Sequence, residues 1–172
     1  MRWIIVALSL ISAAAQATPS YWQGLNNGEL LAPRRMIAQV EQQFPGVVTQ
    51  FSISTQQQQV QYDIQLIEPI TKTCHLLLLN AHDGALLQQQ DQSLDSHNEL
   101  LHLVQHLQQQ QVQFSQLLNQ ALAHKQGKLV SAKLDRGLGI SYIELKLLNA
   151  DGSERLAYDI DHRRQLPLLK WD

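Results

Sequence analysis

An internal repeat constrains this chain more than any other feature, because a duplicated unit must fold twice and then be joined to itself. Gly46 and Gly127 lie 81 positions apart, and each follows a helical pattern and precedes an alternating one. Sliding the 172-residue chain by that interval keeps its apolar positions in phase for about fifty residues without a gap. The aligned pairs include Met36 with Leu117, Ile37 with Leu118, Ile53 with Leu134, Tyr62 with Ile143, Ile64 with Leu145, Leu66 with Leu147, Leu77 with Tyr158, Leu79 with Ile160 and Asn80 with Asp161.

Each unit is predicted to contain one helix followed by three strands. Pro33 suits the first helical turn, and Pro45-Gly46 ends the helix of the first copy. Apolar residues recur between them at helical spacing, and the second copy repeats the pattern up to Gly127. The residues of these two stripes are Met36, Ile37, Val40 and Phe44 in the first copy and Leu117, Leu118, Ala121 and Leu122 in the second.

Strict alternation follows each helix and predicts strands with one buried and one wet face. The apolar positions are Val60, Tyr62, Ile64 and Leu66 in one copy and Ile143, Leu145 and Leu147 in the other. A third strand is predicted over about 73–80 and 155–161, after turns that include Asn149-Ala150-Asp151-Gly152. The fold class is therefore α+β, two tandem units in which a helix packs on a small antiparallel sheet.

The chain is divided into four parts by these patterns. Residues 1–17 are predicted to be a signal peptide, 18–87 the first domain with an N-terminal arm, 88–111 a helical linker, and 112–172 the second domain. In the linker, Ser96 and Glu99 have capping-box spacing, and Leu100, Leu103, Val104 and Leu107 form an apolar stripe. A loose linker is the alternative. In the arm, Tyr21, Trp22, Leu25, Leu30 and Leu31 are expected to dock on the first unit.

The first residues have the three parts of a secretion signal. Met1-Arg2 supplies positive charge, an apolar run from Trp3 to Ala15 follows, and Ala15-Gln16-Ala17 is a small-x-small cleavage site. A retained anchor is the alternative, but the run is shorter than the ~20 residues of a spanning helix. We expect export to the periplasm or the medium, a mature chain from Thr18, and no membrane insertion after cleavage.

The cysteine count and the net charge limit which disulfides and which partners are possible. Cys74 is the one cysteine, so no intramolecular disulfide can form, and its apolar neighbours predict a buried thiol rather than a reactive one. Without Arg2 the chain has 12 basic and 15 acidic residues, a net charge of −3, with no basic tract. Nucleic acid is therefore not expected as a partner.

Runs of glutamine at 56–59, 88–90 and 108–111 are expected to be exposed edges and helix flanks.

These motifs together resemble a PepSY domain. The first copy matches over about residues 31–87, with Phe44-Pro45-Gly46 closing the helix, Tyr62-Asp63-Ile64 in a strand, and Gly84 after the last strand. It has Asn80 where the family usually has Asp. The second copy, about 112–169, departs further, with Gln126-Gly127 for Pro-Gly, Ile143 for the tyrosine and Gln165 for the closing glycine. We place the family's Asp at Asp161.

The resemblance implies a binding and regulatory function. PepSY domains occur in propeptides of secreted metallopeptidases and in envelope proteins, and they are thought to inhibit peptidases or to modulate nearby proteins. It therefore implies a module without an active site of its own, acting on a partner in trans.

Residues with metal-binding or catalytic potential are few. His102 and His106 share a helical face, with His97 and Asp95 nearby, but a third ligand at a defined spacing is lacking, so solvated histidines are expected. His162-Arg163-Arg164 is interpreted as a solvated turn rather than an anion site. Gly137-Leu138-Gly139 fits a hairpin rather than a dinucleotide fingerprint. Asp83 and Asp161, considered as paired carboxylates, are expected to lie apart.

The sequence therefore predicts an exported, non-enzymatic module that regulates or inhibits another envelope protein, such as a peptidase or a sensor's extracytoplasmic domain. No catalytic residue, cofactor or metal is assigned, and the oligomeric state is left open. The alternative is a small-molecule or metal-responsive periplasmic sensor, with a site in a groove between the repeats. A two-domain spacer is a third possibility.

Overall fold

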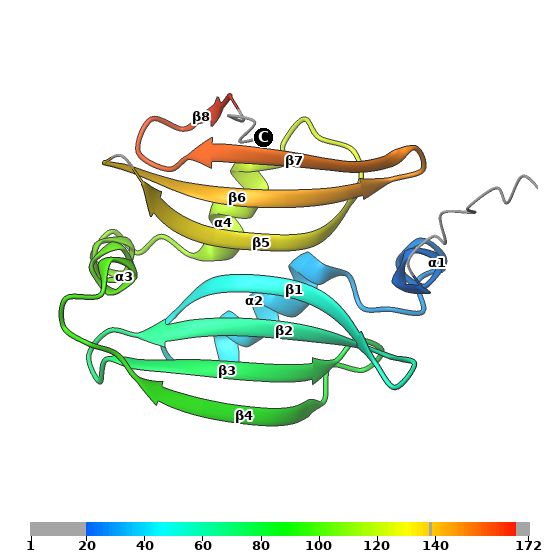
Figure 1. Ribbon diagram of the computed structural model, residues 1–172, viewed down its shortest axis with the longest axis horizontal. Helices are drawn as coiled ribbons and strands as arrows, with labels where there is room; N and C mark the ends of the chain where they lie inside the picture. Colours follow the sequence, from blue (N-terminus) through cyan, green and yellow to red (C-terminus); the bar gives the residue numbers. More distant parts are fainter. Residues whose placement is uncertain (1–19, 138, 168–172) are drawn as a thin grey trace, which may run out of the picture.

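The order of the strands shows how the two repeats are joined. The computed structural model describes residues 20–137 and 139–167, and these contain one antiparallel sheet of eight strands in the order β4-β3-β2-β1-β5-β6-β7-β8. Strands β1 to β4 come from the first repeat and β5 to β8 from the second, so the first strand of each repeat lies at the centre (Figure 1). The fold is α+β, with two four-stranded halves that each carry helices.

The two halves have the same sequence of elements. The first contains α1 (Ser20–Asn27), α2 (Pro33–Gln43), β1 (Val47–Gln56), β2 (Gln59–Glu68), β3 (Thr73–Asn80) and β4 (Leu86–Ser93). The second contains α3 (Glu99–Gln109), α4 (Phe114–Ala121), β5 (Lys128–Gly137), β6 (Ile140–Asn149), β7 (Gly152–Asp159) and β8 (Arg164–Leu166). The predicted linker helix is present as α3, and it occupies in the second half the place in chain order that α1 occupies in the first.

The halves are related by an approximate two-fold axis between β1 and β5. These strands pair antiparallel through three residue pairs, with Phe51 opposite Ala132 at the centre. Phe51 and Ala132 are 81 positions apart, so they are the same position of the repeat. Both strands also carry a β-bulge at equivalent places, between Val48 and Gln50 in β1 and between Leu129 and Ser131 in β5. The repeat predicted from the sequence is therefore confirmed in its strands.

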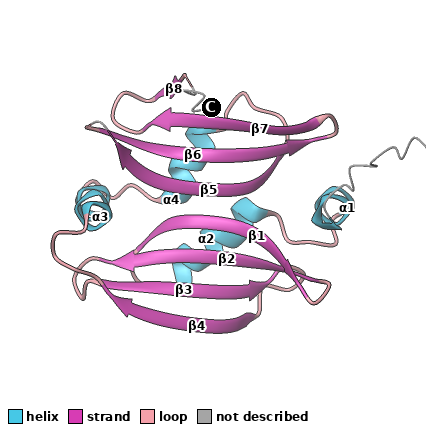
Figure 2. Cartoon of the chain, in the orientation of Figure 1, coloured by secondary structure: helices cyan, strands magenta, loops and turns pink. Residues whose placement is uncertain are grey.

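Helices α2 and α4 lie on one face of the sheet, and no helix of the described residues covers the opposite face (Figures 1 and 2). The buried side is apolar because the alternating residues of the strands point toward these helices. Residues of both halves belong to one continuous hydrophobic cluster, not to two separate cores. Fully buried members of large volume are Met36, Ile37, Phe51, Tyr62, Ile64, Leu66, Ile67, Leu101, Leu107, Phe114, Leu118 and Leu134.

Polar contacts connect α2 with α4 across the axis. The backbone N–H of Ser115 donates to Glu41 Oε1 at 3.1 Å, and Arg34 Nη1 donates to Asn119 Oδ1 at 3.3 Å. Each contact joins the start of one helix to the end of the other, as an antiparallel helix pair requires. The Glu41 carboxylate also places negative charge at the N-terminus of α4, where the helix dipole favours it. The helices therefore hold the two halves together beneath the short β1–β5 junction.

The gapless alignment of the repeats is wrong after the second strand. Tyr62 pairs with Leu79, whereas its counterpart Ile143 pairs with Tyr158, two positions earlier than predicted. The cause is the hairpin: four residues connect β2 to β3, and Ala150-Asp151 alone connect β6 to β7. A shift of two preserves which side chains face the core, so apolar periodicity could not detect it. Asn80 therefore corresponds to Asp159, not to Asp161.

The prediction of three strands per unit is also wrong. A fourth strand, β4, includes Gln88–Gln90, which the sequence patterns assign to the linker. All of its residues are exposed, so it has no apolar alternation for a sequence pattern to show. The N-cap of α3 differs too: Asn98 Oδ1, not Ser96, accepts from the backbone N–H groups of Leu100 and Leu101.

The N-terminal arm docks as predicted. Leu25 and Leu30 are buried, and Tyr21, Trp22 and Leu31 pack against the same cluster. The backbone N–H of Leu31 donates to the carbonyl of Ala81 at 2.8 Å, and the Tyr62 hydroxyl donates to the carbonyl of Leu31. In the described part of the chain, no helix is long and apolar enough to cross a bilayer. The predicted signal peptide, residues 1–17, lies outside the described residues.

Candidate functional site

The face of the sheet opposite α2 and α4, here called the open face, carries two rows of side chains that cross all or nearly all of the strands. Strand pairing places residues directly opposite one another, so the rows follow from the register. The first row is Gln90, Leu76, Gln65, Gln50, Lys133, Glu144, Ala157 and Leu166. The second row is Gln88, Leu78, Asp63, Ser52, Ser131, Lys146 and Arg155.

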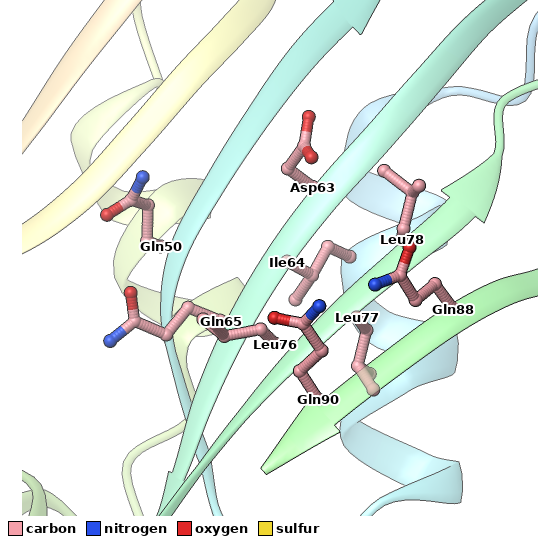
Figure 3. Close-up of a pocket in the computed structure, with 9 residues that line it drawn as sticks. All are labelled: Gln50, Asp63, Ile64, Gln65, Leu76, Leu77, Leu78, Gln88 and Gln90. Atoms are coloured by element: carbon pink, nitrogen blue, oxygen red, sulfur yellow. The ribbon is translucent and has the colours of Figure 1, made fainter. Parts of the chain in front are cut away.

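The first half of the open face contains a shallow hollow of about 280 Å³. Its floor is the half-buried pair Leu76 and Leu78, and four glutamine side chains surround them together with Asp63 (Figure 3). The glutamines are Gln50, Gln65, Gln88 and Gln90. An apolar floor with amides around it can accept a small apolar side chain and hydrogen-bond its backbone, since an amide both donates and accepts.

A second hollow, of about 170 Å³, lies over the junction of the two repeats. It carries more charged side chains than the first, where Asp63 is the one charged residue of the lining. Lys133, Lys146 and Arg155 supply three positive groups and Glu144 one negative group, with Gln50 and Ser52 contributed by the first repeat. Polar side chains from both repeats thus converge at the junction. The strands are paired there, however, so the hollow is a surface depression rather than a groove between two domains.

Several polar groups of the open face have unused bonding capacity. Among the described residues, no hydrogen bond or ion pair is formed by the side chains of Gln50, Gln88 and Gln90 or by the Asp63 carboxylate, although all lie on the sheet surface. Glu144, the counterpart of Asp63 in the repeat, is likewise without such a contact within the described residues. These groups are available to a partner without first breaking an intramolecular bond.

Strand β4 is one border of the open face, and it is accessible along its whole length. It pairs with β3 on one side only, and every residue from Leu86 to Ser93 is exposed. The opposite border, β8, has three residues, includes Arg164 and is followed by Pro167. Charge, proline and shortness are features that protect a sheet edge from pairing. One edge of this sheet is therefore protected and the other is open.

A histidine fixes β4 to its neighbour on the helix side. His75 Nδ1 lies 2.8 Å from Asp91 Oδ1 across the β3–β4 pair, and His75 Nε2 lies 3.8 Å from Glu68 Oε2. A hydrogen bond from Gln89, followed by the bond with His75, lowers the pKa of Asp91. The contact is local to this edge and faces away from the open face, so it positions β4 rather than contributing to the open-face surface.

The histidines singled out in the sequence lie elsewhere. His102 and His106 are exposed on the outer side of α3, and Gln110 Nε2 lies 3.0 Å from His106 Nε2. His97 pairs with Asp95 at 2.9 Å in the preceding turn. Within the described ranges, no group of three or more histidine, cysteine or acidic side chains has a metal-binding arrangement. The structure therefore does not bring His102 and His106 to either hollow.

Asp83 and Asp161 are not brought together. Both are exposed, Asp83 in the turn after β3 and Asp161 in the turn after β7. Figure 1 shows these two turns at opposite ends of the sheet. The basic cluster at 162–164 belongs to the second turn, where His162 Nδ1 lies 2.9 Å from Asp159 Oδ2. Asp159 is buried, and hydrogen bonds from His162 lower its pKa. The cluster therefore closes a turn.

Cys74 is buried, as the sequence predicted. Burial is the main cause of the raised pKa of its thiol, which a hydrogen bond with Gln65 partly offsets. A thiol that is protonated and inaccessible is a poor nucleophile.

The sequence analysis missed the open face because none of its residues belongs to a recognisable motif. The glutamine runs predict exposed edges, which the exposure of Gln88–Gln90 bears out, but nothing in the sequence aligned them with Asp63 and Leu76. A usable signal was present in the repeat itself: Asp63 and Glu144, equivalent positions on wet strand faces, both carry a carboxylate.

Comparison with known proteins identifies similarity to a solved structure. No family model matches the chain, and no curated protein matches it. Among solved structures, the chain is similar to a crystal structure titled as that of a putative lipoprotein (CD1622) from Clostridium difficile 630. The TM-score is 0.42 at 12% identity, over 80% of this chain and 92% of that one. The PepSY resemblance therefore stays a prediction from the sequence.

Proposed function

We propose that this chain is an exported, non-enzymatic binding module that regulates or inhibits another envelope protein, and that it binds this partner through the open face. The observation that carries the proposal is the open face itself, a polar surface across both repeats with two hollows and free amide and carboxylate groups. The secretion signal supports the location, and the PepSY resemblance supports a peptidase or a sensor's extracytoplasmic domain as the partner.

The chemistry of the open face indicates what the partner surface should carry. Asp63 stands among uncharged amides in the first half, so a basic group of the partner fits there. Lys133 pairs with Asp135 at 3.2 Å, which leaves Lys146 and Arg155 against Glu144 in the second half, so acidic groups fit there. Charge complementarity of this kind controls orientation and specificity more than total affinity. A partner with its charges reversed would be rejected.

Site-specific photocrosslinking tests the proposal. A photoreactive amino acid is placed at Gln65, on the open face, or at His102, which is exposed on α3 and serves as the control. Crosslinks in the envelope are identified by mass spectrometry. The proposal expects one partner from Gln65 that is not obtained from His102. Equal crosslinking from both positions, or none from Gln65, would count against it.

The identified partner then allows a direct measurement. Asp63→Lys and Lys146→Glu reverse one charge in each half and should weaken binding of the purified partner by about tenfold or more. Gln109→Lys, an exposed change on α3, is the matched control and should leave affinity unchanged. If the partner is a peptidase, its activity with and without the mature chain shows whether the module inhibits it.

A further inference from the structure

We infer that the open edge strand β4 pairs with β4 of a second copy, giving an antiparallel dimer whose two-fold axis passes through Gln90. The inference does not rest on the partner proposed for the open face, although Gln88 and Gln90 belong to both surfaces. It rests on three observations: the contrast between the two sheet edges, the way the chain already joins its own repeats, and the residues that self-pairing places opposite one another.

The contrast between the edges is specific. Exposed edges normally carry lysine, proline or a bulge that prevents pairing. From Gln88 to Ser93, β4 has none of these and pairs in regular register with β3. It holds four glutamines, Ser93 and one charged residue, Asp91, which His75 already pairs with on the helix side. Its one irregularity is the bulge at Leu87, at the start of the strand. Alternate residues of such a strand direct their N–H and C=O groups away from the sheet.

The chain joins its own halves in the same way, by antiparallel pairing of two equivalent strands about a two-fold axis. Strands β1 and β5 meet antiparallel about an axis that keeps the helices of both halves on one face. Three residue pairs at that junction are enough to continue the sheet. An equivalent axis at β4 would continue the sheet into a second copy, with the open faces of both copies on the same side.

The position of the charged Asp91 decides the register of the β4–β4 pair. Centring the pair on Asp91 would set two carboxylates opposite each other, which is destabilising. Centring it on Gln89 would set Asp91 opposite the bulged Leu87. Centring it on Gln90 sets Asp91 of each copy opposite Gln89 of the other, an acceptor facing a donor. Gln89 Nε2 already donates to Asp91 Oδ1 within one chain, at 3.0 Å.

On the open face, this register also pairs amide with amide. Gln90 lies opposite Gln90 of the second copy, and Gln88 lies opposite Gln92 of the second copy. Glutamine amides donate and accept at once, so identical side chains can bond across a symmetric pair. The second copy is therefore complementary to β4 at every position from Gln88 to Gln92, and only Ser93 lies opposite the bulged Leu87.

Sedimentation of the mature chain, residues 18–172, tests the inference over concentrations from about 1 µM to 1 mM. Wild type should show a reversible dimer. Gln90→Lys and Gln90→Glu each place like charges opposite at the axis and should weaken the dimer by about tenfold or more. An equimolar mixture of the two variants should restore it, because lysine then faces glutamate. Gln165→Lys, the same change on the protected edge strand β8, should have no effect.

Each other result would overturn the inference. A wild-type monomer throughout the range shows that β4 does not accept a second copy, and leaves a segment of another protein as its occupant. A dimer that persists in both Gln90 variants uses another surface. Loss of the dimer without recovery in the mixture excludes pairing through Gln90. Circular dichroism of each variant establishes that it is folded.

Discussion

Phe51 and Ala132 lie opposite each other where β1 meets β5, and they are the same position of the repeat. Both are buried, at 0% and 1% exposure, on the side of the helices. On a symmetric axis two phenylalanine rings would compete for one space, and two alanines would leave it empty. One large and one small side chain together fill the single space at the junction. The Phe51 ring packs against that of Tyr62, with 5.3 Å between centroids.

Phe51→Ala should destabilise the whole fold, because the emptied space belongs to both halves. A cost of about 3–5 kcal/mol is expected for a buried phenylalanine. Ala132→Phe should also destabilise, by overpacking. The double exchange should recover part of the loss, since the ring then enters from the other half and meets Ile143 in place of Tyr62. Urea unfolding measures all three. Additive losses in the double variant would show that the two positions do not share one space.

Gly46 is required where the helix α2 turns into β1. Its φ is +113°, and a Cβ there would lie 2.5 Å from the carbonyl oxygen of Ile67. At Gly139, with φ +76°, an added Cβ would meet nothing within 4 Å. Gly139→Ala should therefore cost about 1 kcal/mol, for the left-handed backbone alone, and Gly46→Ala clearly more. Thermal unfolding compares them, and equal losses would contradict the backbone clash.

Asp159 and Asn80 hold equivalent turns. Asn80 Oδ1 accepts from the backbone N–H of His82 at 2.8 Å, and Asp159 Oδ1 accepts from that of Asp161 at 3.0 Å. Asp159→Asn should keep this bond, as Asn80 does, whereas Asp159→Ala should lose it. The alanine variant is therefore expected to melt at a lower temperature than the asparagine variant. Equal losses in the two variants, which both lack the charge, would show that the charge and not the turn bond is what matters.

The same aspartate should contribute to acid unfolding. Hydrogen bonds from His162 lower the pKa of Asp159 in the folded chain, below the value of about 3.9 expected when unfolded. Its contribution to stability is therefore complete above that value and is lost as pH falls through the lower, folded pKa. Asp159→Asn should flatten the fall in stability below about pH 4. Denaturant unfolding from pH 2 to 7 checks this, with Asp161→Asn as the exposed control.

Cys74 should be unreactive in the folded protein. It is buried, and burial raises the pKa of its thiol, so both access and thiolate fraction are low. Labelling by a thiol reagent at pH 8 should be slow in buffer and fast in denaturant. Gln109→Cys adds an exposed thiol for comparison. Labelling of Cys74 as fast as that of the added cysteine would contradict its burial.

Much of the fold could be predicted from spacing. The helix starting at Pro33, the strands bearing Tyr62 and Ile143, the connecting helix and the docked arm all carry apolar residues at the period of their element. Features without such a period could not be predicted. Strand β4 is exposed on both faces, so nothing alternates, and the two-residue difference between the hairpins preserves the facing of every side chain.

The sequence by itself determined what is local or periodic: the α+β class, the duplication, the core faces and the buried thiol. The tertiary structure decided what depends on pairing between distant strands. It joined the repeats into one sheet through Phe51 and Ala132, aligned Asp63, Leu76 and the glutamines on one face, and left β4 at an edge. The physical reason is that hydrophobic spacing tells which side of an element is buried, but not which element lies beside it.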